Sequence, residues 1–385
     1  MKCGKHPAAP SYFIDWRPEV MKYQAPWWLP GGNLQTIWPA LQARRFSKSR
    51  PLFRRQRWAT PDADFVDIDW LDVAPTLFTS CNALPPDGAG VAWDGPTPRP
   101  PAREQPLLVV FHGLEGSSAS HYAQAFANVA RSRGWACAVP HFRGCSGEIN
   151  LAPRAYHSGD FAEIDWLLKR FASQHAGPVV AVGISLGGNA LMRWAAEMGS
   201  QAGQLVAAAA SVCAPLDLAA SGRAIGRGFN RQVYTRMFLK SMVPKALQKL
   251  AQHPGLFDRD VLLAARDLYA FDNVFTGPLH GFKGVDDYWK RASAKPHLGG
   301  IAIPTLLLNA LNDPFIPSGS LPQPADVSRY ITLWQPAQGG HVGFASSGFP
   351  AHVRAMPEAV AGFLAAHLQT TLPSAMLQAA PSSAK

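Results

Sequence analysis

The 385-residue chain lacks an apolar run long enough to cross a bilayer. The longest run, LVAAAASVCAP at residues 205–215, is well short of the roughly 20 residues that a membrane-spanning helix needs. The first residues, MKCGKHPAAPSYFIDW, contain no apolar core of the kind found in secretory signal peptides. We therefore expect a cytoplasmic protein without a membrane span.

Cysteine is scarce and forms no C-x-x-C pair, which argues against a structural zinc site. The five cysteines are odd in number and fit reduced thiols better than a disulfide framework. There is no H-E-x-x-H motif, and the glycines within residues 183–188 are not followed by Lys-Ser or Lys-Thr. We expect neither a metal nor another cofactor. The cysteines are Cys3, Cys81, Cys137, Cys145 and Cys213.

Acidic residues are outnumbered, because 36 Lys and Arg exceed 26 Asp and Glu by ten. Seven of the basic residues lie within residues 44–57, and no recognised nucleic-acid module accompanies them. We interpret this cluster as a solvated basic face, with an anion-binding surface as the alternative. We expect no nucleic-acid partner and no obligate protein partner. The cluster comprises Arg44, Arg45, Lys48, Arg50, Arg54, Arg55 and Arg57.

Apolar residues make up 47% of the chain, and charged residues only 16%, which is typical of a globular enzyme. Five continuous apolar runs alternate with helical patterns, as expected for parallel strands that are buried on both faces. The alternation predicts an α/β fold with a mostly parallel central sheet flanked by helices. The runs cover residues 107–113, 135–141, 178–185, 205–213 and 305–311.

Between the fourth and fifth runs the alternation stops and helical patterns follow one another. We therefore predict a core formed by residues 51–214 and 298–369, with a helical cap inserted at residues 215–297. Residues 1–50 are rich in Trp and Pro, which predicts an irregular segment that packs its indoles on the core. Residues 370–385 are predicted to be a disordered tail.

The stretch AVGISLGGNAL at residues 181–191 places a serine between two glycines at the spacing G-x-S-x-G. An apolar strand pattern ends at Ser185, and a helical pattern follows it. A strand-to-helix turn of this kind projects a serine hydroxyl above the sheet and aims the helix N-terminus at it. Gly183 and Gly187 let the neighbouring backbone approach closely. The pattern predicts that Ser185 is a nucleophile.

A serine nucleophile needs a base that takes its proton and a carboxylate that orients the base. After a turn of this kind, the acid and then the histidine follow along the chain. His341 in the loop QGGHVGF follows the expected last strand and should emerge beside Ser185; a structural turn histidine is the alternative. Asp313 in LNDPF follows the neighbouring strand and is the favoured acid. Its competitor, Asp217 in CAPLDLAA, is interpreted rather as a helix cap.

Acyl transfer also requires two backbone N–H groups that stabilise the developing oxyanion. One is expected from Leu186, after the nucleophile, and the other from Leu114, after Gly113 in the loop HGLEG. Arg143 and His157 lie in loops near the expected mouth of the site. Contact with substrate is one interpretation for both, and hydrogen bonds that stabilise the loops are the favoured one.

Cations and apolar side chains alternate along one helical pattern of the predicted cap. The arrangement is typical of a helix that contacts a membrane surface, but core packing of a cap predicts the same spacing and is favoured. The cations are Arg236 with Lys240 and Lys245 with Lys249, and the apolar residues are Tyr234, Phe238 and Met242.

Eight segments follow one another along the chain: PWWLPGGNLQTIWP, FHGLEGSSASHY, HFRGCSGE, YHSGD, GISLGGN, PLHGFKGVDDYW, NALNDPF and GGHVGF. Together they resemble the YheT-type branch of the α/β-hydrolase family, from about residue 20 to about residue 368. The resemblance implies an α/β-hydrolase fold and the activity of a serine carboxylester hydrolase. It also implies a catalytic triad formed by Ser185, Asp313 and His341. It also implies relatives in eukaryotes that act on lipid esters. Asn33 departs from the family pattern, in which a histidine is commoner after WLPGG.

Three functions are therefore considered. The favoured one is a serine hydrolase that cleaves a small-molecule or lipid carboxylic ester through an acyl-enzyme intermediate. A lipase or phospholipase that makes transient contact with a membrane surface is the second. The third is a non-catalytic, ligand-binding member of the fold. The sequence argues against it, because a non-catalytic protein has no physical need for a serine, an acid, a base and an oxyanion loop together.

Overall fold

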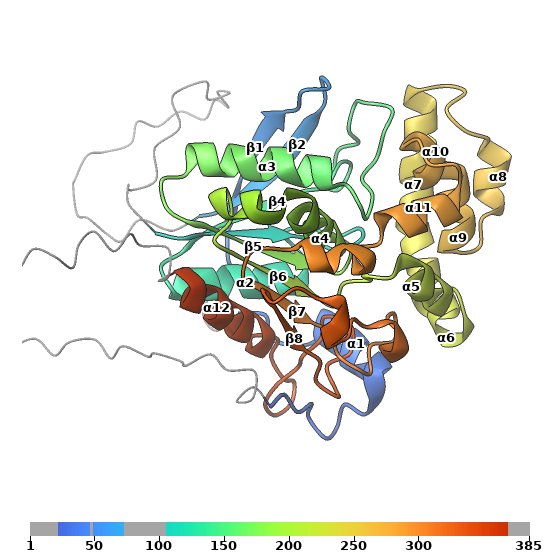
Figure 1. Cartoon of the computed structure of the whole chain (residues 1–385). Coiled ribbons are helices and arrows are strands. Elements are labelled where there is room, and N and C mark those ends of the chain that lie inside the picture. The colour runs from blue at the N-terminus through green and yellow to red at the C-terminus, as the bar shows by residue number, and fades with distance from the viewer. Residues whose placement is uncertain (1–21, 47–48, 73–104, 369–385) are drawn as a thin grey trace, which may run out of the picture.

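One eight-stranded sheet organises the molecule (Figure 1). The computed structural model describes residues 22–46, 49–72 and 105–368; the predicted tail and the first 21 residues lie outside them. Within these ranges, no helix combines the length and the apolar character needed to cross a membrane.

The strand order is β1-β2-β4-β3-β5-β6-β7-β8. β1 pairs antiparallel with β2, and β2 with β4, whereas all other neighbours are parallel. The predicted mostly parallel sheet is confirmed. The strands are β1 (Phe53–Ala59), β2 (Phe65–Leu71), β3 (Leu107–Phe111), β4 (Ala136–Pro140), β5 (Val179–Ile184), β6 (Ala208–Val212), β7 (Thr305–Leu308) and β8 (Ile331–Trp334).

Helices cover both faces of the sheet. α2 (His121–Ser132) and α12 (Ala355–Leu368) lie on one face, and α3 (Phe161–Gln174) and α4 (Leu186–Met198) lie on the other. Successive strand residues therefore enter different cores: Val110 packs in the cluster with α2 and α12, and Val109 in the cluster with α3 and α4. Because both faces are covered, the central strands consist of continuous apolar runs.

Helices between β6 and β7 form a separate group at the carboxyl edge of the sheet, and we call this group the cap (Figure 1). It has its own hydrophobic cluster, centred on Phe271 and Phe275. Its elements are α5 (Leu218–Ile225), α6 (Gly228–Asn230), η3 (Arg231–Thr235), α7 (Arg236–Gln252), α8 (Arg259–Ala264), α9 (Leu268–Phe271), η4 (Asp272–Thr276), α10 (Gly277–Leu279) and α11 (Val285–Ala292). The last helical turn before β7, η5 (Lys295–Gly300), packs against α4 of the core instead.

The N-terminal segment is more regular than predicted, because α1 (Gly31–Leu41) is helical. Its Pro39 makes a helix unfavourable by local propensity, so tertiary contacts must decide the conformation here. The Trp38 indole donates a hydrogen bond to the carbonyl oxygen of Pro350 (2.9 Å) and packs edge-on against Trp28. Trp27, in contrast, is 91% exposed and packs no indole on the core.

Candidate active site

Ser185 occupies the sharp turn between β5 and α4. Its backbone has φ 51° and ψ −117°, a conformation that costs a non-glycine residue about 1–3 kcal/mol. The turn is held by hydrogen bonds, because Ser185 N–H donates to Val212 and the Ser185 carbonyl accepts from Gly188 and Asn189. The serine hydroxyl thereby lies above the carboxyl edge of the sheet, at the N-terminus of α4.

Two of the predicted glycines lie where backbones meet. A Cβ on Gly183 would be 2.4 Å from the carbonyl oxygen of Gly187. A Cβ on Gly187 would be 2.5 Å from the carbonyl oxygen of His112. Since backbone atoms cannot move aside as a flexible side chain can, the turn requires glycine at both positions.

The structure brings Ser185, His341 and Asp313 together in one hydrogen-bonded row. His341 Nε2 lies 2.9 Å from Ser185 Oγ, and His341 Nδ1 lies 2.8 Å from Asp313 Oδ2. With the Nδ1 proton donated to the carboxylate, Nε2 is free to accept the serine hydroxyl proton. The second carboxylate oxygen of Asp313 accepts from the N–H of Phe315 (2.8 Å), which fixes its orientation.

Asp217, the competing acid, lies outside this row. Its carboxylate accepts a hydrogen bond from the backbone N–H of Ala220 (2.9 Å) and caps the N-terminus of α5. The interpretation of Asp217 as a helix cap is confirmed.

The loop that carries His341 is held by α1, a role that the sequence did not reveal. Thr36 Oγ1 accepts from the N–H of His341 (2.8 Å), and Gln35 Oε1 accepts from the N–H of Gly339 (2.9 Å). Gln35 Oε1 also accepts from the side chain of Asn312, one residue before the acid (2.9 Å). The available signal was the stretch NLQT, which places three polar residues inside a segment otherwise rich in Trp and Pro.

The two predicted oxyanion donors, Leu114 and Leu186, lie at the pocket of Ser185. Leu114 and Leu186 line the pocket together with Ser185, and in the described part of the chain neither backbone N–H has a hydrogen-bond partner. The neighbouring groups are occupied: Tyr122 OH accepts from Gly113 N–H, and Tyr156 OH accepts from Glu115 N–H, both at 3.0 Å. The loop therefore holds the Leu114 N–H open for a ligand.

Glu115 links this loop to the cap, a contact that the sequence analysis did not predict. Its carboxylate accepts from Tyr156 OH (2.9 Å) and forms an ion pair with Lys245 of α7 (2.8 Å). Because Glu115 follows Leu114 directly, this ion pair ties α7 of the cap to the chain next to a predicted oxyanion donor.

Arg143 lines the pocket, but its guanidinium is engaged elsewhere. It is buried and forms ion pairs with Glu163 (2.5 Å), Asp64 (2.7 Å) and Asp62 (2.8 Å). These bonds tie the loop after β4 to α3 and to the turn before β2. The favoured interpretation, a loop-stabilising role, agrees with this geometry.

His157 also lines the pocket. Its Nδ1 accepts a hydrogen bond from Gly159 N–H (3.2 Å), and its ring packs against that of His280, with centroids 4.5 Å apart. Burial lowers the pKa of His157 to about 3, so the imidazole is neutral near pH 7. A neutral imidazole at this place can donate one hydrogen bond from Nε2.

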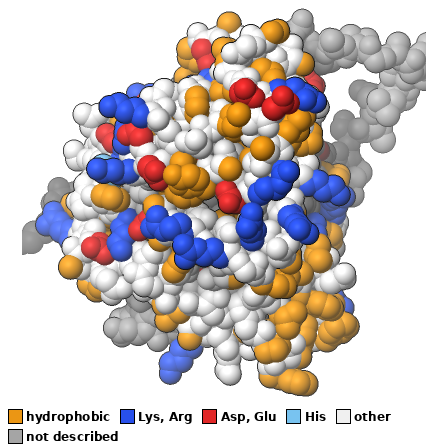
Figure 2. Space-filling view, turned by 90° about the vertical axis from the view of Figure 1, so that its right-hand side faces the viewer, with side chains coloured by type: hydrophobic (Ala, Val, Ile, Leu, Met, Phe, Trp, Pro, Cys, Tyr) orange, Lys and Arg blue, Asp and Glu red, His pale blue; other side chains and the backbone are white. Residues whose placement is uncertain are grey.

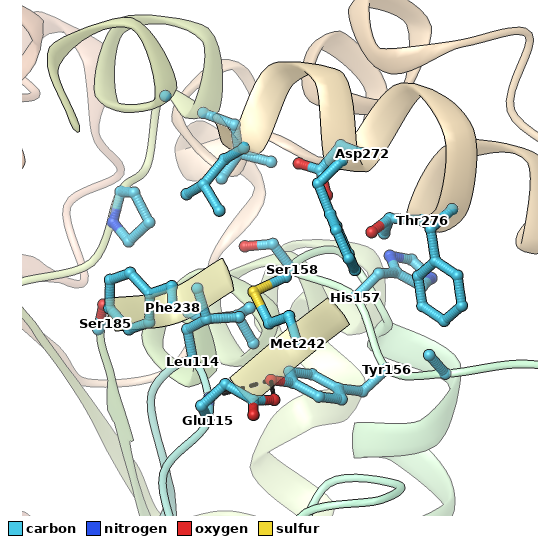
Figure 3. A pocket seen from close by; sticks show the side chains of 18 of the residues that line it. Leu114, Glu115, Tyr156, His157, Ser158, Ser185, Phe238, Met242, Asp272 and Thr276 are labelled. Carbon is cyan, nitrogen blue, oxygen red and sulfur yellow. Dashed lines mark hydrogen bonds between the residues drawn. The ribbon is translucent and has the colours of Figure 1, made fainter. Parts of the chain in front are cut away.

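A cavity of about 150 Å³ extends from Ser185 and His341 into the cap. Figure 3 shows Ser185 at one side with Phe238 next to it, Met242 near the middle, and Asp272 and Thr276 toward the other side. Trp289 donates its indole N–H to Asp272 (2.9 Å), and burial raises the pKa of this carboxyl to about 6. The lining is thus mainly apolar, and Asp272 and Thr276 add polar groups far from the serine.

Among the described residues, Cys213, Asp313 and His341 place potential metal-ligand atoms within 4.8 Å of one another. The donor set does not fit a metal. Asp313 and His341 are already hydrogen-bonded to each other. Burial raises the pKa of Cys213 well above its ordinary value, so its thiol stays protonated. Cys213 instead accepts a hydrogen bond from Val342 N–H (3.3 Å) within the histidine loop.

The sequence of this chain is similar to a family model and to several known proteins. A family model described as the alpha/beta hydrolase fold matches residues 106–347. The chain is 38% identical over 316 residues to "Putative esterase YheT" of Escherichia coli, covering 81% of this chain and 84% of that protein. It is 26% identical over 331 residues to phospholipase ABHD3 of Homo sapiens, covering 84% and 73%. It is 30% identical over 253 residues to the monoacylglycerol lipase of Saccharomyces cerevisiae, covering 62% and 55%.

Proposed function

The chain belongs to the α/β-hydrolase family, and from this premise we propose that it is a serine hydrolase that cleaves carboxylic esters through an acyl-enzyme. The observation that carries the proposal is the row Ser185–His341–Asp313, with contacts of 2.9 and 2.8 Å. The names of the relatives, an esterase, a phospholipase and a lipase, support ester hydrolysis.

In the proposed reaction, Ser185 Oγ attacks the acyl carbon of the ester while His341 Nε2 takes the serine proton. The oxygen that becomes negative accepts hydrogen bonds from the backbone N–H groups of Leu114 and Leu186. His341 then gives the proton to the departing alkoxide, so that an alcohol leaves and the acyl group stays on Ser185. Water next loses a proton to His341 and attacks the acyl carbon; the proton returns to Ser185 Oγ and a carboxylic acid leaves.

Asp313 accepts a hydrogen bond from His341 throughout this sequence. It orients the imidazole and stabilises the imidazolium that forms in each half-reaction. The apolar lining supports an ester with a hydrophobic acyl or alcohol group, because Phe238, Met242 and Phe275 bury such a group away from water.

The test is hydrolysis of p-nitrophenyl esters from acetate to palmitate by the wild type and by Ser185→Ala. We expect the wild type to turn over esters and the variant to lose about 10⁴-fold or more in kcat. A variant with wild-type turnover would show that another group is the nucleophile. A wild type that binds the esters without turnover would favour the non-catalytic, ligand-binding alternative.

A further inference from the structure

One long stretch of the cap carries no acidic residue. Residues 218–257 contain no Asp or Glu but seven Lys and Arg. Two of the seven face inward: Lys245 pairs with Glu115, and Lys249 is buried and donates to the carbonyls of Asn150 and Ala152. These two are therefore part of the packing of the cap.

The other five cations face solvent. All are exposed, and in the part of the chain that the structure describes none of them has an ion pair or a side-chain hydrogen bond. Exposed cations need no partner to be tolerated, but five of them within eighteen residues, with no acidic residue among them, create a local positive potential that favours an anionic partner. They are Arg223, Arg227, Arg231, Arg236 and Lys240.

Three apolar side chains are exposed among these cations. Phe229 is 54% exposed, Val233 36% and Met237 55%. They are spaced four residues apart along the continuous helical segment of α6, η3 and α7, so they form one stripe. Core packing of the cap accounts for Tyr234, which is buried, but not for this stripe.

The helix α1 lies against the segment that carries this stripe. Tyr234 OH donates to Asn33 Oδ1 (2.9 Å), which holds α1 against η3, and the next residue of α1, Leu34, is exposed. Figure 2 shows Lys and Arg side chains across the face that the cap presents, with hydrophobic side chains beside and below them.

The same surface borders the pocket of Ser185. Phe238, the residue after Met237, lines that pocket. The rings of Tyr234 and Phe315 have centroids 4.5 Å apart, and those of Phe315 and His341 have centroids 4.2 Å apart. A bilayer on this surface would place lipid close to the pocket.

We propose that this surface, which we call the docking face, binds an anionic lipid bilayer. The apolar stripe would enter the boundary between headgroups and acyl chains, while the cations meet anionic headgroups. A nucleic acid would satisfy the cations, but it offers no apolar layer for exposed Phe and Met side chains. The docking face comprises Phe229, Val233 and Met237 with Arg223, Arg227, Arg231, Arg236 and Lys240.

The test is flotation of the full-length chain with vesicles of phosphatidylcholine containing phosphatidylserine, and with vesicles of phosphatidylcholine alone. Two double variants probe the two components: Phe229→Ser with Met237→Ser, and Arg231→Gln with Lys240→Gln. The matched control is Lys169→Gln with Arg329→Gln, which removes two exposed cations that lie outside the cap.

We expect the wild type to float with the anionic vesicles more strongly than with the neutral ones. Each docking-face variant should lose about tenfold or more in vesicle partitioning, and the control should match the wild type. Thermal unfolding of each variant checks that these exposed substitutions leave the fold intact.

The proposal is overturned if the wild type floats with neither vesicle, or if the control loses as much as the two docking-face variants. Loss in the cation variant alone, with duplex DNA binding that the same variant abolishes, would identify a nucleic-acid surface instead. Vesicle binding requires no turnover, so its outcome is independent of the test of Ser185.

Discussion

The side chain of Thr36 accepts a hydrogen bond from the backbone N–H of His341, which lies 305 residues further along the chain. The same hydroxyl donates to the Gly32 carbonyl at 2.7 Å, so α1 holds it in place. The N-terminal helix is thereby part of the support of the proposed catalytic base.

We predict that Thr36→Val lowers kcat by about 10- to 100-fold and changes KM little, because the histidine loop loses a contact that positions the imidazole. Steady-state kinetics on a soluble p-nitrophenyl ester measure this. Thr36→Ser keeps the hydroxyl and should restore most of kcat. If Thr36→Val keeps wild-type kcat, or if Thr36→Ser falls as far as Thr36→Val, the hydrogen bond is not what positions the loop.

Asp313 and Asp217 form a matched pair of acids at the ends of neighbouring strands. Asp313→Asn should lower kcat by about 10³- to 10⁴-fold, because the amide cannot stabilise the imidazolium and favours the wrong tautomer. Asp217→Asn should keep near wild-type kcat, since it only caps α5. A reversed order of the two effects would exchange their assignments.

The ion pair between Lys245 and Glu115 gives a third prediction. Lys245→Ala should lower kcat/KM by about tenfold, because the cap no longer restrains the loop that presents Leu114 N–H. Lys290→Ala, which removes an exposed cation of the cap, is the control and should have no effect. Equal losses in both variants would mean that total charge, not this contact, matters.

The tight turn at Ser185 predicts a steric effect. In Gly187→Ala the new Cβ would meet the backbone oxygens of His112 and Phe111 at 2.5 and 2.6 Å. We expect the free energy of unfolding to fall by about 1–3 kcal/mol, together with a loss of activity. Urea denaturation measures the change. Gly319→Ala, where a Cβ meets nothing within 4 Å, should be neutral, and a neutral Gly187→Ala would contradict the geometry.

The buried carboxyl of Asp272 predicts a dependence of stability on pH. Burial raises its pKa from 3.8 to about 6, so the folded protein holds this proton more tightly than the unfolded chain. Its contribution to stability is therefore fully present below pH 3.8 and is lost as the pH rises through 6. Asp272→Asn cannot ionise and should exceed the wild type in stability at pH 7 by up to about 3 kcal/mol.

Near pH 4 the two proteins should come close to each other in stability. Urea denaturation at both pH values measures the difference, with the exposed Asp260→Asn as the control. A gain that is equal at both pH values would show that packing, not ionisation, is responsible.

The sequence was sufficient for the parallel strands of the sheet and for the residues at their carboxyl ends. Buried parallel strands leave continuous apolar runs, and Ser185, Asp313 and His341 lie at or shortly after the ends of expected strands, so they could be named before their contacts were known. Their hydrogen-bonded arrangement matches the expectation, while their catalytic roles stay predictions.

Contacts that depend on distant parts of the chain could not be predicted. The role of Gln35 arises from its approach to Asn312 and Gly339, and no local pattern records that approach. Helical spacing likewise could not separate Lys249, which is buried, from Lys240, which is exposed, because the orientation of α7 is set by the core against which it packs.

The most direct test of the account is the identity of the residue that a fluorophosphonate probe modifies, read by peptide mass spectrometry. We predict that the wild type carries the phosphonyl group on Ser185, that Ser185→Ala carries none, and that the exposed control Ser173→Ala is labelled as the wild type. Labelling of another serine, or a wild type that stays unmodified, would contradict the proposal that Ser185 is an activated nucleophile.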